Sequence, residues 1–329
     1  MRQYLALITL LAVAGPGHAA EAVRPEVWLD DMNRAFRDLN YDGVFSYFTG
    51  SDLASLRVVH MVIDGEQRER LVHLNGAPRE IVRKGDTVAC ILLPGDKLLE
   101  LEGSIPSGPF ARAFVRRFDR ISGNYALSYF GEDRVAGRAA YRIAVSPKDQ
   151  DRYGYRLWLD KEHRLLLRSE LIDLSGARLE IFQFTSIVTG AAVKVSSLKS
   201  EEPDGSMITH LTLANDNPTP VAKRDVRWRA RWLPAGFTMD AADIRRTPSK
   251  LKTVNTMMYS DGLAAFSVFV EDMPESGAAN MVSRNGATVA VTHFVPGPNQ
   301  KNALVTLVGE VPEDTAWRVA KSIYYQPSP

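Results

Sequence analysis

The sequence predicts an α+β fold, mainly of antiparallel β-strands and divided into two domains. Three observations favour this fold class. The chain has 329 residues, which is more than one hydrophobic core usually organises. Turn-forming residue pairs recur about ten residues apart over residues 64–96, as in a meander of hairpins. A polar stretch with two prolines marks residues 214–226 as a linker.

The first residues are typical of a secretory signal. Arg2 gives a basic start, residues 5–14 form an apolar run, and glycine and proline at residues 15–17 precede small residues. The run is about half of the ~20 apolar residues that span a bilayer. We therefore expect residues 1–22 to be cleaved and the mature chain to be a soluble protein of the periplasm.

The first domain, residues 23–213, is predicted to begin with a helix over residues 25–39, where apolar residues recur every three or four positions. Hairpins should follow. A strand at residues 155–160 alternates apolar and charged residues, which predicts one buried face. The apolar phase slips within residues 178–184, which predicts a β-bulge. The turn pairs are Asp64-Gly65, Asn75-Gly76, Gly85-Asp86, Gly95-Asp96, Ser175-Gly176 and Asp204-Gly205.

Residues 110–121 differ from the hairpins around them. Three phenylalanines and an isoleucine share a helical stripe, and four arginines surround it. The segment is predicted either to close one end of a curved sheet or to form a basic, aromatic lid over an acidic lipid head group. The two interpretations are compatible.

The second domain, residues 227–325, is predicted to be a small sheet with one helix. Pro312 and acidic residues in the first turn mark the start of the helix. The predicted strands cover residues 240–246, 253–259, 263–270, 287–294 and 303–308, and the helix covers residues 313–323.

The sequence contains no recognisable catalytic or cofactor motif. It has no nucleophile elbow, no phosphate-binding loop, no dinucleotide fingerprint, and no pair of histidines at metal-binding spacing. The single cysteine, Cys90, lies in an apolar run, as a buried thiol would. A formal net charge of +1 argues against a nucleic-acid binder. We expect a binding protein that is not an enzyme and uses no cofactor or metal.

Several ordered segments together resemble the RseB/MucB family, the periplasmic regulators of the sigma-E envelope-stress response. The strand YRLWLD at residues 155–160 also looks like the lipoprotein carriers LolA and LolB, whose fold the family's large domain shares. That fold is a strongly curved antiparallel sheet, a half-open barrel with helices on its concave side. The segments are GVFSY at 43–47, RERL at 68–71, RVAGR at 134–138, RYGYRLWLD at 152–160, LRSEL at 167–171, WLPAGF at 232–237, YSDGL at 259–263, FSVFV at 266–270 and GEVP at 309–312.

The resemblance implies a regulator that binds the periplasmic segment of a transmembrane anti-sigma factor of the RseA/MucA type. It would shield that segment from site-1 proteolysis and be released when lipid or lipopolysaccharide binds, thereby controlling sigma-E activity. The partner would recruit it to the inner membrane. The alternative is a periplasmic lipid or lipoprotein carrier of the LolA type, and a hydrolase using Cys90 is a third reading. The sequence leaves open whether the chain forms a homo-oligomer.

Two groups of residues are candidates for binding. Residues 223–252 hold nine Lys/Arg against three Asp, so they could seat an acidic anti-sigma segment or lipid phosphates, or form a solvated face. An apolar group in the first domain could bind lipid or pack in its core. The partner-binding candidates are Arg227, Arg229, Arg231, Arg245 and Arg246, and the lipid-binding candidates are Trp28, Met32, Phe36, Phe114, Arg116 and Arg117.

Overall fold

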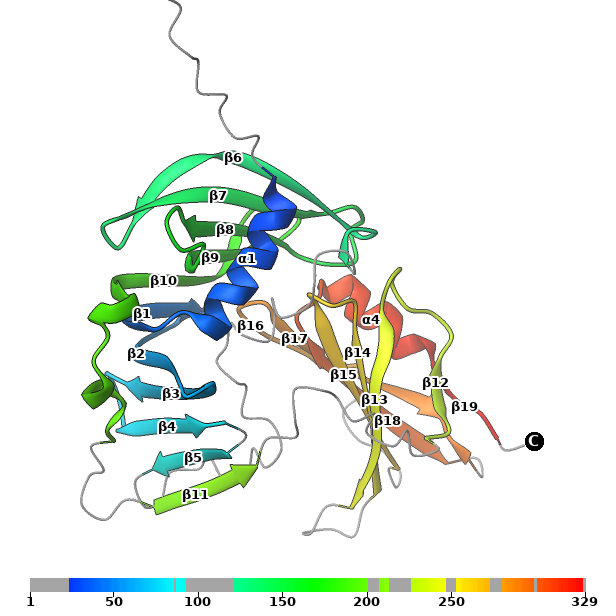
Figure 1. Ribbon diagram of the computed structural model, residues 1–329. Coiled ribbons are helices and arrows are strands. Elements are labelled where there is room, and N and C mark those ends of the chain that lie inside the picture. The colour runs from blue at the N-terminus through cyan, green and yellow to red at the C-terminus, as the bar shows by residue number, and fades with distance from the viewer. Residues whose placement is uncertain are drawn as a thin grey trace, which may run out of the picture.

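The computed structural model describes residues 24–85, 87–92, 121–200, 207–212, 226–246, 253–272, 280–298 and 301–327. Two large sheets lie beside each other, the first built from residues before 213 and the second from residues after 237 (Figure 1). Three predicted features lie outside the described residues: the signal, most of the helix at 110–121, and all but the last residue of the linker.

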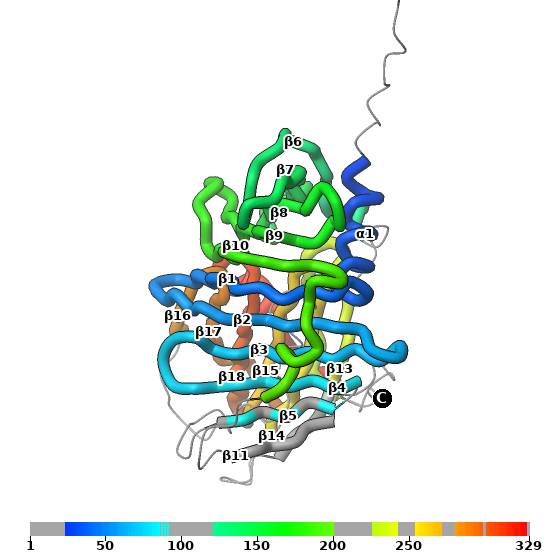
Figure 2. Tube along the Cα trace, turned by 60° about the vertical axis from the view of Figure 1, so that its left-hand side comes forward, coloured from blue at the N-terminus to red at the C-terminus, as the bar shows by residue number. Residues whose placement is uncertain are grey.

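The first sheet is an open meander of eleven antiparallel strands. Its order is β11-β5-β4-β3-β2-β1-β10-β9-β8-β7-β6, and Figure 2 shows these strands following one another along the sheet. The end strands β11 and β6 do not pair with each other, which confirms the predicted half-open sheet. The strands are β1 (Tyr41–Thr49), β2 (Asp52–Ile63), β3 (Glu66–His73), β4 (Arg79–Lys84), β5 (Thr87–Leu92), β6 (Tyr125–Val135), β7 (Arg138–Pro147), β8 (Gly154–Asp160), β9 (Leu166–Ile172), β10 (Arg178–Thr189) and β11 (Met207–Thr212).

Residues with positive φ close the hairpins where the sequence predicts turns. Asp64 and Gly65, between β2 and β3, have φ values of 54° and 78°, as a tight type I′ turn requires. Gly85 follows β4 with φ 54°, and Gly176 lies between β9 and β10 with φ 85°. The hairpin prediction is confirmed at these turns, while Gly95-Asp96 and Asp204-Gly205 lie outside the described residues.

Helix α1 (Pro25–Asp38) lies against the large sheet and contacts β2 and β6 (Figure 1). Pro25 suits the first helical position because the amide hydrogen it lacks would have no helical partner there. The side chains of Leu29 and Met32 are buried in the core of the sheet. The predicted helix is confirmed, and it ends one residue before Leu39.

Strand β8 is buried on both faces, so the prediction of a single buried face is wrong. Trp158 and Asp160 lie opposite the apolar face and are only 5% and 2% exposed. Arginines from neighbouring strands cover them: Arg168 Cζ lies 4.7 Å from the Trp158 ring centroid, and Arg138 pairs with Asp160. Long arginine side chains can bury the residues beneath them, which alternation along one strand does not reveal.

Strand β10 has a bulge within the predicted range, but not between Ile181 and Phe182, where the apolar phase slips and the pairing is regular. Pairing with β9 shifts register between Arg178 and Glu180, and pairing with β1 shifts opposite Val44 and Phe45. Phe182 and Phe184 are both buried despite the shift. Such irregularities increase the local twist and so help the sheet to curve.

The second sheet has six antiparallel strands in the order β13-β14-β15-β18-β17-β16, and helix α4 (Glu313–Ser322) packs on β17 and β18 (Figure 1). The five predicted strands and the helix are confirmed with small boundary shifts. The strands are β13 (Thr238–Arg246), β14 (Thr253–Ser260), β15 (Ala265–Asp272), β16 (Val282–Asn285), β17 (Thr288–Pro296) and β18 (Asn302–Gly309), with a separate ribbon of β12 (Trp228–Ala230) and β19 (Ile323–Tyr325).

Each sheet has its own hydrophobic core, but the two sheets are joined. Leu263, between β14 and β15, and Ala287, between β16 and β17, are buried in the core of the first sheet. The division into domains at residues 23–213 and 227–325 stays a prediction. No helix in the described part of the chain is long and apolar enough to cross a membrane.

Candidate functional site

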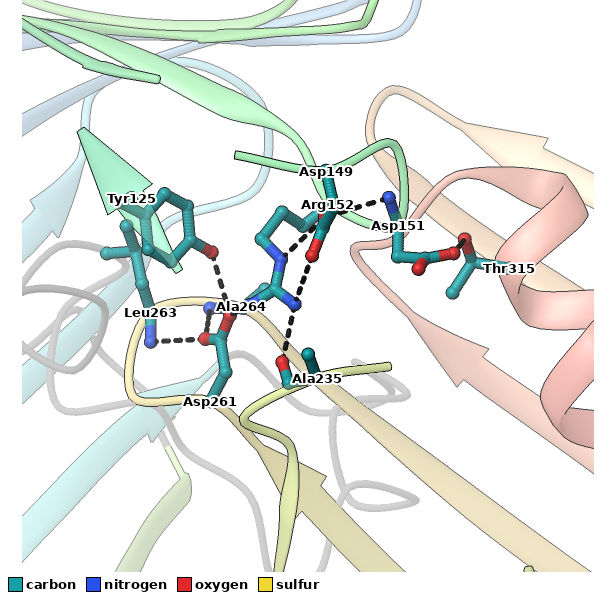
Figure 3. Close-up of polar contacts among 9 residues, drawn as sticks. All are labelled: Tyr125, Asp149, Asp151, Arg152, Ala235, Asp261, Leu263, Ala264 and Thr315. Carbon is teal, nitrogen blue, oxygen red and sulfur yellow. Dashed lines mark hydrogen bonds and ion pairs between the residues drawn. The ribbon is translucent and has the colours of Figure 1, made fainter. Parts of the chain in front are cut away.

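The two sheets meet at a buried polar cluster, which we call the Arg152 junction (Figure 3). Tyr125 begins β6, and Asp149 and Arg152 lie in the connection before β8. Ala235 precedes β13, and Asp261 follows β14. The side chains of Arg152 and Asp261 are both 0% exposed, so a buried cation from one half of the chain meets a buried anion from the other.

The Arg152 guanidinium is surrounded by acceptors. Its Nε and Nη2 donate to the Asp149 carboxylate at 3.0 and 2.9 Å, and Nη2 also donates to the Ala235 carbonyl at 2.6 Å. Nη1 pairs with Asp261 Oδ2. The Tyr125 and Phe237 ring centroids lie 5.4 and 5.2 Å from Cζ, close enough for cation–π attraction. Only a guanidinium presents a planar fork of five donors that can serve all these partners.

Asp261 links the junction to the turn between β14 and β15. Its Oδ1 accepts the backbone N–H groups of Leu263 and Ala264, both at 2.8 Å, and its Oδ2 accepts the Tyr125 hydroxyl at 2.9 Å (Figure 3). Burial and the charge of Asp261 raise the pKa of the Tyr125 phenol well above its usual value. Tyr125 therefore stays protonated and remains a hydrogen-bond donor.

A second contact between the sheets contains two carboxyl groups. Glu180 on β10 accepts the Tyr47 hydroxyl at 2.6 Å and the backbone N–H of Ala287 at 3.3 Å. Glu310 follows β18 in the second sheet, and burial together with the charge of Glu180 raises its pKa to about 7. The protonation of Glu310 thus changes the charge between the sheets near neutral pH.

Two glycine turns also meet between the sheets. Gly50 joins β1 to β2, Gly286 joins β16 to β17, and both have φ 58°. A Cβ atom at Gly286 would lie 3.0 Å from the Gly50 backbone nitrogen and closer still to Thr49 Oγ1. Only glycine fits such a close approach in this backbone conformation.

Of the partner-binding candidates, Arg229 lies in β12, and Arg227 and Arg231 flank that strand. Trp228 is 2% exposed, while Arg227 and Arg231 beside it are exposed to solvent. Arg229 is half-buried, and its Nη1 donates to the Trp228 carbonyl at 2.9 Å and also to the carbonyl of Val226.

Two further candidates, Arg245 and Arg246, are the last residues of β13 in the six-stranded sheet. Their side chains lie outside the described part of the structure. The structure therefore places three arginines on the β12–β19 ribbon and two on β13, and no described contact joins the two groups.

The lipid-binding candidates on α1 make core contacts. Met32 is 0% exposed, Phe36 packs against the core of the first sheet, and Trp28 stacks on Tyr141 with centroids 4.0 Å apart. These contacts agree with the alternative that the residues pack in the core. Lipid binding by these residues stays a prediction. Phe114, Arg116 and Arg117 lie outside the described residues.

One cluster in the first sheet has the residue types of a metal site. Asp160, Glu162 and His163 offer ligand atoms within 4.8 Å of one another. Arg138, however, pairs with Asp160, reaches Glu162 at 2.8 Å, and lies 3.1 Å from His163 Nδ1. The guanidinium thus occupies the place where a cation would bind, and the cluster is explained by this arginine.

Sequence reasoning missed the Arg152 junction, although both partners lie in segments that carry the family resemblance. Arg152 begins RYGYRLWLD and Asp261 is the third residue of YSDGL. The two residues are 109 positions apart. The surface on α4 was also missed: Arg318 lies over the Trp232 ring and Lys321 over Trp317.

The fold and the junction define an antiparallel β-protein in which an open, curved sheet is held against a smaller sheet with a helix. Each half matches a model from the same family: the MucB/RseB N-terminal domain covers residues 24–202, and the MucB/RseB C-terminal domain covers residues 222–324. The chain belongs to the MucB/RseB family.

The curated relatives are regulatory proteins of sigma factors. The sigma factor AlgU regulatory protein MucB of Pseudomonas aeruginosa is 36% identical over 97% of this chain and 95% of its own length. The sigma-E factor regulatory protein RseB of Escherichia coli K12 is 32% identical over 90% of this chain and 89% of its own.

Solved structures of MucB resemble this chain across both halves. MucB in the Pseudomonas aeruginosa MucA/MucB complex is 34% identical, with a TM-score of 0.75 over 92% of this chain and 99% of that one. A crystal structure of MucB is 32% identical, with a TM-score of 0.59 over 91% of this chain and 97% of that one.

Proposed function

We propose that this chain binds the periplasmic segment of a membrane-anchored anti-sigma factor and thereby restrains a sigma factor of the sigma-E type. The observation that carries the proposal is the match to MucB in its complex with MucA, which extends over both halves of the chain at 34% identity. Similarity over both halves of the chain is stronger support for a shared kind of partner than similarity in the fold of one domain alone.

The proposed mechanism is shielding. The bound regulator covers the anti-sigma segment, so the site-1 protease cannot cleave it, and release of the regulator starts the cascade that frees the sigma factor. Lipid or lipopolysaccharide would promote release by binding better to the free regulator than to the complex. By linkage, the anti-sigma segment must then weaken lipid binding by the same factor, typically about 5- to 150-fold.

The proposed compartment is the periplasm, reached through a cleaved signal at residues 1–22. The partner segment lies there, and the complex would be held at the inner membrane by its anchored partner. In this proposal the chain acts as a binding protein rather than an enzyme. The curated relatives are described as regulatory proteins, which supports this choice.

The proposed seat for acidic residues of the anti-sigma segment is formed by the arginines in and beside β12, Arg227, Arg229 and Arg231, together with Arg245 and Arg246. Replacing Arg227, Arg229 and Arg231 with serine should weaken the complex about tenfold at low ionic strength and flatten its salt dependence, because charge pairs at a rim act through screened attraction. Calorimetry at two salt concentrations measures both effects. Unchanged affinity at both would remove this surface from the binding site.

The matched control replaces three exposed cations of the first domain, Arg37, Lys84 and Arg134, with serine, and it should leave affinity unchanged. The function itself is tested with the mature wild-type chain and the purified periplasmic domain of the same organism's anti-sigma factor. Binding that protects this domain from the site-1 protease is the expected result. Absence of binding at micromolar concentrations would contradict the proposed function.

A further inference from the structure

The outer surface of α4 carries two cations whose partners are aromatic rings. We define the α4 ridge as Trp232, Trp317, Arg318 and Lys321. Arg318 Cζ lies 3.7 Å from the Trp232 ring centroid, and Lys321 Nζ lies 5.4 Å from that of Trp317. Both cations are exposed and both rings half-buried. Within the described ranges, neither cation lies at ion-pair distance from a carboxylate.

The same pattern continues onto the β12–β19 ribbon beside the helix. Arg231 is exposed and lies over the Tyr324 ring, with 4.8 Å between Cζ and the centroid. The acidic residues of α4, Glu313 and Asp314, lie in its first turn, at the other end from Lys321 in its last turn. A positive, aromatic surface therefore stands out in a chain whose formal net charge is +1.

We propose that the α4 ridge docks on the head groups of an anionic phospholipid bilayer. Tryptophan and tyrosine favour the membrane–water interface, and lysine and arginine are attracted to anionic lipids. A guanidinium stacked face-on against a ring keeps its edge N–H groups directed outward, where they can donate to phosphate oxygens.

The shape of the ridge favours a bilayer over an acidic peptide. The ridge follows the outside of a helix, which is convex, whereas bound peptides usually lie in a groove or along a sheet edge. This docking goes beyond the proposed function and does not depend on it. A membrane-anchored partner would strengthen it, because tethering raises the effective concentration of the bilayer at the ridge.

The test uses the mature chain and sedimentation with vesicles of phosphatidylcholine containing about one third phosphatidylglycerol, compared with pure phosphatidylcholine. Wild type should bind the anionic vesicles, with binding lost at high salt. Arg318→Gln with Lys321→Gln should weaken binding about 25-fold, since each basic residue near such a surface contributes about fivefold. Both cations are exposed, so the thermal unfolding midpoint should stay unchanged.

The matched control, Lys84→Gln with Arg134→Gln, removes the same charge from exposed positions in the first domain and should bind vesicles as wild type does. Equal vesicle binding by wild type and the ridge variant would overturn the proposal, as would wild-type binding that ignores the anionic lipid. A ridge variant that still binds vesicles but no longer binds the anti-sigma segment would also overturn the proposal. That result would mean that the ridge binds a peptide. Loss of vesicle binding with intact anti-sigma affinity supports it.

Discussion

Single side chains between the sheets show two ways of burying a carboxyl group. Asp261 pairs with Arg152 and accepts a hydrogen bond from the Tyr125 hydroxyl. Glu310 faces the charge of Glu180, and burial and that charge raise its pKa to about 7. Burial removes the hydration of an ionised carboxylate, and a nearby negative charge repels it. Both effects favour the protonated form, and both act on Glu310.

The raised pKa of Glu310 makes stability depend on pH in a definite direction. Between the usual value of 4.5 and about 7, the folded chain holds a proton that the unfolded chain has lost, so stability falls as pH rises through this window. Glu310→Gln should reduce the fall between pH 5 and 8 by on the order of 2 kcal/mol. Urea unfolding across this pH range measures it.

The control for Glu310 is Glu132→Gln, a carboxylate with a 54% exposed side chain in the first sheet, which should leave the pH profile unchanged. Parallel profiles for wild type and Glu310→Gln would contradict the prediction. Comparing each variant with wild type removes the contributions of other titrating groups, such as His60 and His293, whose pKa values burial lowers.

The sequence could not predict Arg152 and Asp261 as a pair. Their separation of 109 residues leaves no spacing signal, and each residue alone resembles a turn or surface residue. By contrast, the exposed Arg227 next to the buried Trp228 follows from local alternation, because side-chain direction in an extended segment is a local property.

At the scale of elements, length decided what could be predicted. Long strands and the helices α1 and α4 repeat their apolar pattern often enough to be recognised, and turn pairs such as Asp64-Gly65 mark the ends of strands. Strands β12, β16 and β19 have three or four residues, which is too short for a pattern. The end of α4 was predicted one residue too late because Ile323 is apolar and suits either state, yet it begins β19.

The meeting of two glycine turns gives a prediction about a hairpin. Gly286→Ala should destabilise the protein by about 2–4 kcal/mol, because the added Cβ meets the Gly50 turn and left-handed backbone disfavours alanine. Gly65→Ala has nothing within 4 Å of its Cβ and should cost only about 1 kcal/mol. Thermal unfolding compares them, and equal losses would show that the turns do not press on each other.

For the whole molecule, the Arg152 junction should decide how firmly the sheets are held together. Arg152→Met leaves the Asp261 carboxylate buried without its cation, which typically costs about 3–5 kcal/mol. Adding Asp261→Asn removes the stranded charge and should recover part of the loss. Urea unfolding measures stability, and small-angle scattering measures the spread of domain arrangements, which should broaden in Arg152→Met.

The control for the junction is Arg178→Met. This variant removes the ion pair between Arg178 and Glu170, and the Arg178 side chain is 55% exposed. Glu170 is buried but keeps its pairs with Arg156 and Arg168 in this variant, which should therefore unfold nearly as wild type does. An Arg152→Met protein as stable as Arg178→Met, with unchanged scattering, would mean that the junction does not hold the sheets together.

The placement of Leu263 and Ala287 in the core of the first sheet has a consequence for how the chain acquires its structure. A polypeptide synthesised from its N-terminus delivers all eleven strands of the first sheet before either residue emerges. Until then the first core has an open apolar site. The nascent first sheet would therefore be most exposed to proteases and most in need of a chaperone during this interval, which ends only as the last strands arrive.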